Sequence, residues 1–279
     1  MRPNDPAFHL KRLGQWVAFY VVGIVTMGLF LFPIYWMILS SFKPALASSA
    51  FPPVFTFSPT LDNYIAVFAQ NDFLRFLWNS LVIGVGSTVI GLVLGLPAAY
   101  AIVRFHHRRT AFLVLVARIA PGISYLVPWF ILFSQLNLVG TFTALILAHL
   151  TVSLPLIIWI MLGFIEDVPI ELEEAALIDG CSRAGVFWRV MLPLIKPGIA
   201  TAAILSFIMS WNNFLYSVVL ADNDTQTLPV AVYSFLSFGS FDWGGLTAAA
   251  TLISLPVMLL VLVIQRHIVR GLAAGAVKG

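Results

Sequence analysis

The sequence predicts an all-α integral membrane protein with six transmembrane helices. Of its 279 residues, 60% are hydrophobic and only 10% are charged, whereas about a quarter of the residues in an ordinary soluble domain are charged. So few charges cannot cover the surface of a soluble protein of this size, and disordered chains are polar. Both classes are therefore excluded. No strand pattern with one lipid-facing side occurs, so the spans are expected to be helices.

Six apolar segments are long enough to cross a bilayer, because a hydrocarbon core of ~30 Å requires about 20 helical residues. Turn residues or charge clusters separate them. The expected spans are approximately 16–40, 77–103, 110–134, 140–165, 198–221 and 244–266. The whole chain, 1–279, is expected to form one transmembrane domain with a long loop over 166–197. Pro121 and Pro128 in the third span and Pro155 in the fourth are expected to kink their helices.

The distribution of basic residues predicts the orientation. Twelve Lys and Arg residues lie in the two termini, the 104–109 turn and the 166–197 loop, whereas the opposite side holds only Lys43 and Arg75. Cytoplasmic segments carry the excess of Lys and Arg, so both termini and the 166–197 loop are expected in the cytoplasm. The apolar stretch before Ala45 is longer than a signal-peptide core of 7–15 residues, and we expect the first span to be retained.

Two long connections lie on the external side, over residues 43–75 and 222–243. Loops longer than about 12–15 residues are usually either functional or disordered. Both contain prolines and aromatic residues, which favours ordered docking surfaces.

The cytoplasmic loop predicts a helix–elbow–helix. Glu171, Glu173 and Glu174 suit the positive end of a first helix. Gly180 is placed for a left-handed C-terminal cap. Ser182 can then cap a second helix, which Pro193 is expected to end. Taken alone, such a loop is also typical of an amphipathic interfacial segment that only connects two spans.

The spacing within this loop resembles a known motif. Glu174-Ala175-Ala176 is followed after three residues by Gly180, and after nine more by Val190-Met191-Leu192-Pro193. This is similar to the EAA loop of ABC importer permeases, with Val190 in place of the usual Ile. The stretch 211–214, Trp-Asn-Asn-Phe, resembles the Trp-Asn-acid-Phe sequence of carbohydrate permeases, and Asn213 replaces the commoner acid. The tail over 265–279 is similar to that of maltose-type permeases, so the resemblance covers essentially the whole chain.

The resemblance implies a bacterial inner-membrane permease subunit of a binding-protein-dependent importer for a sugar, polyol or related glycoside. It implies four partner chains: a second permease, two copies of an ATPase and an extracytoplasmic solute-binding protein. The chain has no Gly-x-x-x-x-Gly-Lys-Ser/Thr loop. We therefore expect no catalytic residue, cofactor or metal in this chain, and ATP and Mg to be bound by the partner ATPase. No nucleic-acid partner is expected, only membrane lipid besides these proteins.

The same resemblance assigns site residues. Contact with the ATPase is implied for the coupling-loop residues Glu174, Ala175, Ala176, Gly180, Leu192 and Pro193. The C-terminal tail, through Gly275 and Lys278, is implied to reach the same ATPase dimer. Docking of the solute-binding protein is implied for Thr227, Leu228, Asp242 and Trp243.

Polar residues inside the spans are candidates for the translocation path, because such groups are costly in a membrane. These candidates are Arg118, Trp211, Asn212 and Asn213, since sugars are bound by amide hydrogen bonds and aromatic stacking. Arg118 is alternatively a snorkelling or paired cation, and the two asparagines are alternatively interhelical contacts. His149 favours an interhelical hydrogen bond over a ligand role. In maltose-type systems the second permease can hold the substrate site alone.

Two other function classes remain alternatives at this point. A secondary transporter of a small polar solute usually has internal repeats and coupling-ion ligands, and no convincing repeat relates 1–140 to 141–279. A membrane enzyme needs clustered catalytic groups near one face, whereas the five histidines are scattered and the acids cluster only in the cytoplasmic loop. The single cysteine, Cys181, excludes an internal disulfide. Neither alternative explains the spacing of the cytoplasmic loop.

Overall fold

The computed structural model describes residues 6–70, 72–233 and 241–276, with the side chains of 6–13, 70 and 263–276 left out. Every regular element in these ranges is helical, which confirms the predicted all-α class. The chain divides into two compact units, one of Met1–Asn71 with Phe235–Leu252 and one of Asp72–Ser234 with Ile253–Gly279. The single domain expected over 1–279 stays a prediction.

Four helices of the described chain are long and apolar enough to cross a membrane, and the count is six if each of two bent helix pairs is one span. The four are Gly14–Ser41, Phe73–Arg104, Phe142–Glu166 and Trp243–Leu262. The two pairs are Arg108–Ile119 with Ile123–Gln135, bent by 93°, and Arg183–Leu194 with Lys196–Trp211, bent by 77°. The first, second, fourth and sixth predicted spans thus fall on continuous helices, and the third falls on the first bent pair. The fifth falls on only the second helix of the other pair and on α12 (Leu215–Leu220), because Arg183–Leu194 lies in the 166–197 loop.

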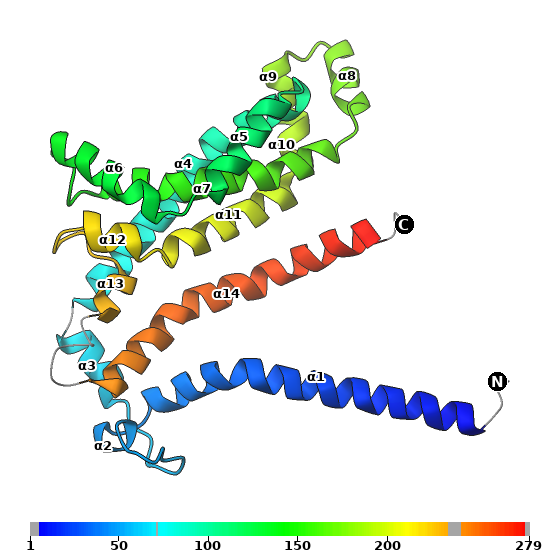
Figure 1. The fold of residues 1–279 in the computed structure, drawn as a ribbon. Coiled ribbons are helices and arrows are strands. Elements are labelled where there is room, and N and C mark those ends of the chain that lie inside the picture. The colour runs from blue at the N-terminus through cyan, green and yellow to red at the C-terminus, as the bar shows by residue number, and fades with distance from the viewer. Residues whose placement is uncertain (1–5, 71, 234–240, 277–279) are drawn as a thin grey trace. The chain divides into compact units, whose positions relative to one another are not determined.

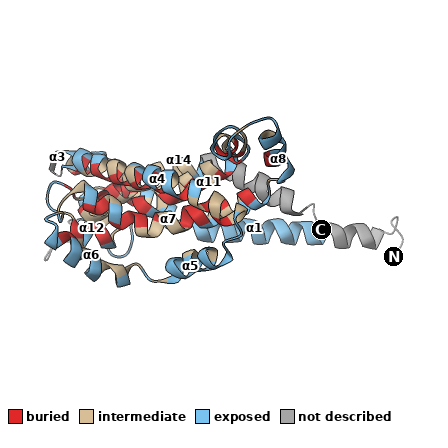
Figure 2. Ribbon diagram, turned by 90° about the horizontal axis from the view of Figure 1, so that it is seen from above, coloured by how far each residue is buried: buried red, intermediate tan, exposed pale blue. Residues whose placement is uncertain are grey.

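The first unit contains α1 (Pro6–Ser41), α2 (Ala45–Ser48), α3 (Asp62–Gln70) and the beginning of α14 (Trp243–Ala276). The apolar window of α1 has a mean hydropathy of 2.3, and none of it is buried. Most of its described side chains are exposed, as the pale blue ribbon of Figure 2 shows. An apolar helix in this state requires lipid or another membrane protein around it.

The loop that follows α1 is tied to the end of that helix. The Asn63 amide donates hydrogen bonds to the carbonyl oxygens of Ser41 and Lys43, both at 2.8 Å. The Lys43 ammonium is buried and lies 3.9 Å from the centre of the Trp36 ring, a cation–π geometry. Desolvation lowers the pKa of Lys43 from its ordinary value. This part of the 43–75 loop is therefore packed.

The second unit is built on three helices that run side by side: α4 (Phe73–Arg104), α7 (Phe142–Glu166) and α11 (Lys196–Trp211), shown in cyan, green and yellow in Figure 1. A Cβ atom on Gly91 would lie 2.7 Å from Ile157 Cδ1, and one on Gly95 would lie 2.8 Å from Ile157 Cγ2. Glycine at these positions of α4 thus permits close contact with α7, as small residues do between membrane helices.

The third predicted span is a sharp break rather than a kinked helix. Helix α5 (Arg108–Ile119) ends before Pro121, and α6 (Ile123–Gln135) starts after Gly122. Proline cannot donate a backbone hydrogen bond, which explains the position of the break. Pro128 and Pro155 lie inside α6 and α7. The fifth predicted span is also interrupted, because α11 ends at Trp211 and is followed by the short helices α12 (Leu215–Leu220) and α13 (Leu228–Tyr233).

Candidate functional site

The elbow of the 166–197 loop is built as the local sequence predicts. Helix α8 (Glu171–Ile178) is followed by Asp179 and then by Gly180, whose φ is +88°. The N–H of Gly180 donates to Leu177 O and that of Cys181 donates to Ala176 O, which is the double hydrogen bond of a Schellman cap. The Ser182 hydroxyl then accepts a hydrogen bond from Gly185 N at 3.1 Å and caps α9 (Arg183–Val186). Both predicted caps are confirmed.

The second helix of the loop contains a wide turn that local rules did not predict. After α9 comes the π-helical turn η1 (Phe187–Met191), where Leu192 N donates to Phe187 O five residues earlier. Pro193 cannot donate to the carbonyl of Arg189, so regular α-helical bonding is lost here. The helix ends at Leu194 in α10 (Leu192–Leu194), one residue beyond the predicted stop, and the chain then turns into α11.

One acidic residue of α8 is buried instead of exposed. The Glu173 side chain is only 7% exposed, and its Oε1 accepts a hydrogen bond from Arg104 Nε at 2.5 Å. Its Oε2 accepts a hydrogen bond from the Tyr100 hydroxyl, also at 2.5 Å. Arg104 additionally donates to Val168 O at 2.9 Å. Three polar contacts therefore join the loop to the last turns of α4. The sequence alone does not single out Glu173 as a site residue, because Glu171 and Glu174 fit the same helix-start pattern.

The residues predicted to contact an ATPase form a mainly exposed surface. Glu174, Ala175, Gly180 and Pro193 are exposed, and Ala176 is half-buried. Leu192 is half-buried and packs against the core cluster that contains Ile157 and Met161. Beside α8, a cleft of about 470 Å³ is lined by Tyr100, Arg104, Glu173, Glu174, Arg183 and Trp188, among others. The elbow thus presents one face outward while Leu192 and Glu173 anchor it.

The residues predicted to line a translocation path have mostly structural contacts. Trp211 is buried, and its indole N–H donates to Ile253 O of α14. Asn213 Oδ1 accepts a hydrogen bond from Tyr216 N at the start of α12. Asn212 is exposed, and its amide donates to Ile208 O of its own helix.

Arg118 is exposed at the end of α5, with its guanidinium 4.4 Å from the centre of the Trp159 ring. This contact with α7 is the paired-cation alternative. Among the described residues, no hydrogen bond or ring contact joins Arg118 to Trp211, Asn212 or Asn213.

The predicted interhelical bond of His149 is confirmed. Its Nδ1 lies 2.6 Å from the hydroxyl of Ser210, which also accepts a hydrogen bond from Ser87 at 3.0 Å. The hydroxyl groups of Thr88 and Ser206 lie 3.4 Å apart and form a second hydrogen bond between α4 and α11. A polar seam therefore joins α4, α7 and α11 inside the apolar core.

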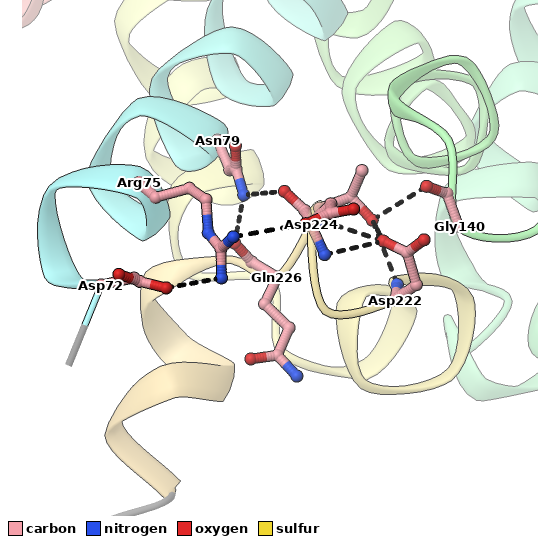
Figure 3. A network of polar contacts seen from close by, with 8 residues as sticks. Asp72, Arg75, Asn79, Gly140, Asp222, Asp224 and Gln226 are labelled. Atoms are coloured by element: carbon pink, nitrogen blue, oxygen red, sulfur yellow. Dashed lines mark hydrogen bonds and ion pairs between the residues drawn. The ribbon is translucent and has the colours of Figure 1, made fainter.

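The loop that follows α12 is fixed by a polar network, drawn in Figure 3. Arg75 pairs with Asp72 at 2.8 Å and with Asp224 at 3.2 Å. The Asn79 amide donates to the carbonyl oxygens of Asp224 and Gln226 at 2.7 and 2.9 Å. These contacts hold the 222–226 segment against the beginning of α4.

Asp222 organises the turn of this loop. Its carboxylate accepts hydrogen bonds from the Thr225 hydroxyl and from the backbone N–H groups of Asp224 and Thr225. The hydrogen bond from Thr225, foremost, lowers the pKa of Asp222 below its ordinary value. Thr225 in turn donates to Gly140 O at 3.1 Å, so the turn is also joined to the connection before α7.

The four residues predicted to dock a binding protein separate into two kinds. Thr227 and Leu228 are buried, and Leu228 N donates to Ser80 Oγ of α4. Their burial removes both side chains from the surface in this conformation. Asp242 and Trp243 are exposed, and the docking role predicted for them stays a prediction.

The predicted tail contacts fall at the edge of what the structure describes. Gly275 lies within the backbone range of α14, and Lys278 lies outside the described residues.

Comparison with known proteins identifies similar chains over nearly the whole length. A family model described as "Binding-protein-dependent transport system inner membrane component" matches residues 91–274. The trehalose transport system permease protein SugB of Mycobacterium tuberculosis is 37% identical over 278 residues, covering 96% of this chain and 99% of SugB. The sulfoquinovosyl glycerol transport system permease protein SmoH of Agrobacterium fabrum is 35% identical over 254 residues, covering 89% of each chain.

A similar fold occurs in a bacterial ABC transporter involved in the import of the acidic polysaccharide alginate. The TM-score is 0.75 at 21% identity, with 95% of this chain and 99% of that chain covered.

Proposed function

The chain belongs to the family of binding-protein-dependent transport system inner membrane components, and on this premise we propose that it is a permease subunit of an ATP-driven ABC importer for a sugar, polyol or related glycoside. The observation that carries the proposal is the exposed, doubly capped elbow at Gly180. The carbohydrate class is supported by the names of relatives at 35–37% identity, which transport trehalose and sulfoquinovosyl glycerol. No relative described above favours a secondary transporter.

The elbow is the element on which an ATPase partner acts. Its exposed residues Glu174, Ala175, Gly180 and Pro193 fit into a cleft of the ATPase, which binds ATP and Mg. Closure of two such ATPases pushes the elbow and rocks the helices between two states, a rigid-body transition of a common kind. A second permease completes the path, and a solute-binding protein delivers the substrate.

The elbow and the 222–226 turn lie at opposite ends of the α4–α7–α11 core (Figure 1). The elbow end carries the basic 104–109 turn and faces the cytoplasm, because positive segments stay on that side. Both chain termini are cytoplasmic, where the tail with Gly275 and Lys278 reaches the ATPase dimer. On the external side Asp242 and Trp243 meet the binding protein, and Asn212 and Arg118 are the path residues with exposed side chains.

Co-purification tests this function. A tagged chain is extracted from its host's membranes in mild detergent, and every retained chain is identified by mass spectrometry. We expect an ATPase with a Walker motif and a second six-span permease. A chain that purifies alone after gentle extraction would contradict the importer. The binding protein is then screened by thermal shift against trehalose, sulfoquinovosyl glycerol, sorbitol and alginate oligosaccharide, and stabilisation by none of these would contradict the carbohydrate class.

A further inference from the structure

We propose that Arg104 and Glu173 form a clamp that makes the cytoplasmic elbow and helix α4 move as one body. The inference rests on the proposed function, since it concerns how a push on the elbow reaches the membrane helices. Glu173 is then a positioning residue. It lies next to Glu174, which the ATPase contacts, but it points the other way, into the protein.

The clamp holds the loop at two places. The Arg104 guanidinium bonds the Glu173 carboxylate through Nε and the Val168 carbonyl through a terminal nitrogen. Val168 precedes α8 and Glu173 lies in its first turn, so one side chain of α4 fixes the helix and its entry. Such a planar, multiply bonded contact is one that arginine makes and lysine does not.

Tyr100 extends the clamp to the second half of the loop. Its hydroxyl donates to Glu173, and its ring lies 5.1 Å from the ring of Phe187 in η1. Tyr100 and Arg104 are one helical turn apart on α4 and therefore face the same side. Both halves of the elbow are thus joined to the same two turns of α4.

Burial makes the contact unlike an ordinary surface ion pair. The side chains of Arg104 and Glu173 are 13% and 7% exposed. Exposed pairs contribute little, but removal of one partner from a buried pair leaves an uncompensated charge. The partners also suit their helix ends, because Arg104 is in the last turn of α4 and Glu173 is in the first turn of α8.

The contact has a mechanical consequence. Helix α8 packs mainly on α9 and η1, which belong to the loop itself. Of these, η1 packs into the core through Phe187 and Met191, so without the clamp a push on α8 would reach the core mainly through η1. With the clamp, the same push reaches α4, and through the close contacts of Gly91 and Gly95 with Ile157 it reaches α7.

Spin-label distances in the assembled complex test the clamp. Cys181 is the only cysteine of the chain, so one nitroxide goes there and one on V93C, an exposed position of α4. The labelled complex must retain its ATPase. We expect a narrow distance distribution that stays unchanged when ATP and vanadate trap the ATPase. In E173A and R104A we expect a broader distribution that shifts on trapping. E173Q and Y100F, which keep part of the bonding, should give intermediate widths.

Glu171 supplies the matched control, because it is an exposed acid in the same helical turn. E171A should keep the narrow, unchanging distribution of the parent chain. We also expect the ATP hydrolysis stimulated by the binding protein to fall in E173A by about 2- to 30-fold, the range in which such contacts alter coupling between sites. A narrow, unchanging distance in E173A, Y100F and E173Q, or equal broadening in E171A, would overturn the clamp.

The outcome is separable from that of the proposed function. If no ATPase associates with the parent chain, the importer proposal fails, while the distance distribution of the full chain alone still reports the clamp. If the ATPase associates and hydrolyses ATP but E173A behaves as the parent chain, only the clamp fails.

Discussion

The indole N–H of Trp211 donates a hydrogen bond to the carbonyl oxygen of Ile253, 3.2 Å away, and so joins the end of α11 to α14. Trp211 is 1% exposed. We expect Trp211→Ala to destabilise the chain by about 3–5 kcal/mol, the usual cost of removing a buried aromatic side chain. Trp211→Phe keeps an aromatic ring but removes the hydrogen bond to Ile253. Loss of that bond should lower the free energy of unfolding by only about 0.6 kcal/mol, the average for interhelical hydrogen bonds in membranes. Thermal unfolding in detergent measures both, and equal losses in the two variants would contradict this account.

Because Gly180 has a left-handed conformation, alanine at this position should weaken ATPase binding, whereas alanine at a helical glycine should not. Gly180→Ala places a Cβ at a φ of +88°, at a cost of about 1–2 kcal/mol. If the same free energy is lost from ATPase binding, the affinity of the ATPase for the elbow falls by about 5- to 30-fold. Gly163→Ala is the control, because this exposed glycine of α7 has open space around it and alanine favours a helix. Affinity titration of the ATPase should separate the two, and a similar response would argue against a strained elbow.

The exposed carboxylate of Glu174 predicts a second effect on ATPase binding. Glu174→Ala should weaken ATPase binding by about tenfold or more, as loss of a charged contact at a docked interface does. Glu171→Ala, one turn earlier on α8 and equally exposed, should leave binding unchanged. The two affinities are measured by the same titration in nanodiscs. If Glu174→Ala binds the ATPase as well as Glu171→Ala does, Glu174 is not the contact.

The close approach of α4 to α7 predicts intolerance of larger side chains. Gly95→Val should destabilise the chain by about 1–3 kcal/mol, because overpacking forces neighbours to shift and Ile157 Cγ2 occupies the space. Gly23→Val in α1 has no neighbour within 4 Å and should have little effect. Ile157→Ala combined with Gly95→Val should recover part of the loss in unfolding experiments. Full tolerance of Gly95→Val would contradict the packing.

The hydrogen bonds of Asp222 predict that the stability of the 222–226 turn depends on pH. The folded chain lowers the pKa of this carboxyl, so the stabilisation is present above its ordinary pKa of about 4 and is lost as the pH falls through that value and below. Amide exchange at 223–226, compared between the parent chain and Asp222→Ala at each pH, measures it. We expect protection by the carboxylate at pH 7 that declines as the pH falls below about 4. A constant difference would exclude this role of Asp222.

Local hydrogen bonding in the elbow was predictable, and distant pairing was not. Gly180 and Ser182 act through atoms within five residues, and the spacing of glycine and serine specifies such caps. Glu173, by contrast, is distinguished from its acidic neighbours only by Arg104, 69 positions earlier in the chain. No local rule selects which of three acids faces the core.

The break at Pro121 and the residues with predicted path and docking roles also show that contacts between distant parts of the chain were not predictable. The position of the break at Pro121 followed from proline chemistry, but its 93° angle depends on how α6 packs. The sequence pattern of 211–214 predicts a path role for Asn213, and in the fold its side chain accepts a hydrogen bond from Tyr216 N in the first turn of α12. The resemblance implies a docking role for Leu228, but its side chain is buried and its backbone N–H donates to Ser80, 148 positions away in the chain.

The length of α1 has a consequence for its setting in the bilayer. Its stretch Gly14–Ser41 has 28 residues and is about 42 Å long as a helix, against a hydrocarbon core of about 30 Å. Such hydrophobic mismatch is relieved by tilting the helix or by thickening the lipid around it. The inclination of α1 should therefore respond to the acyl-chain length of the membrane in which the protein is reconstituted.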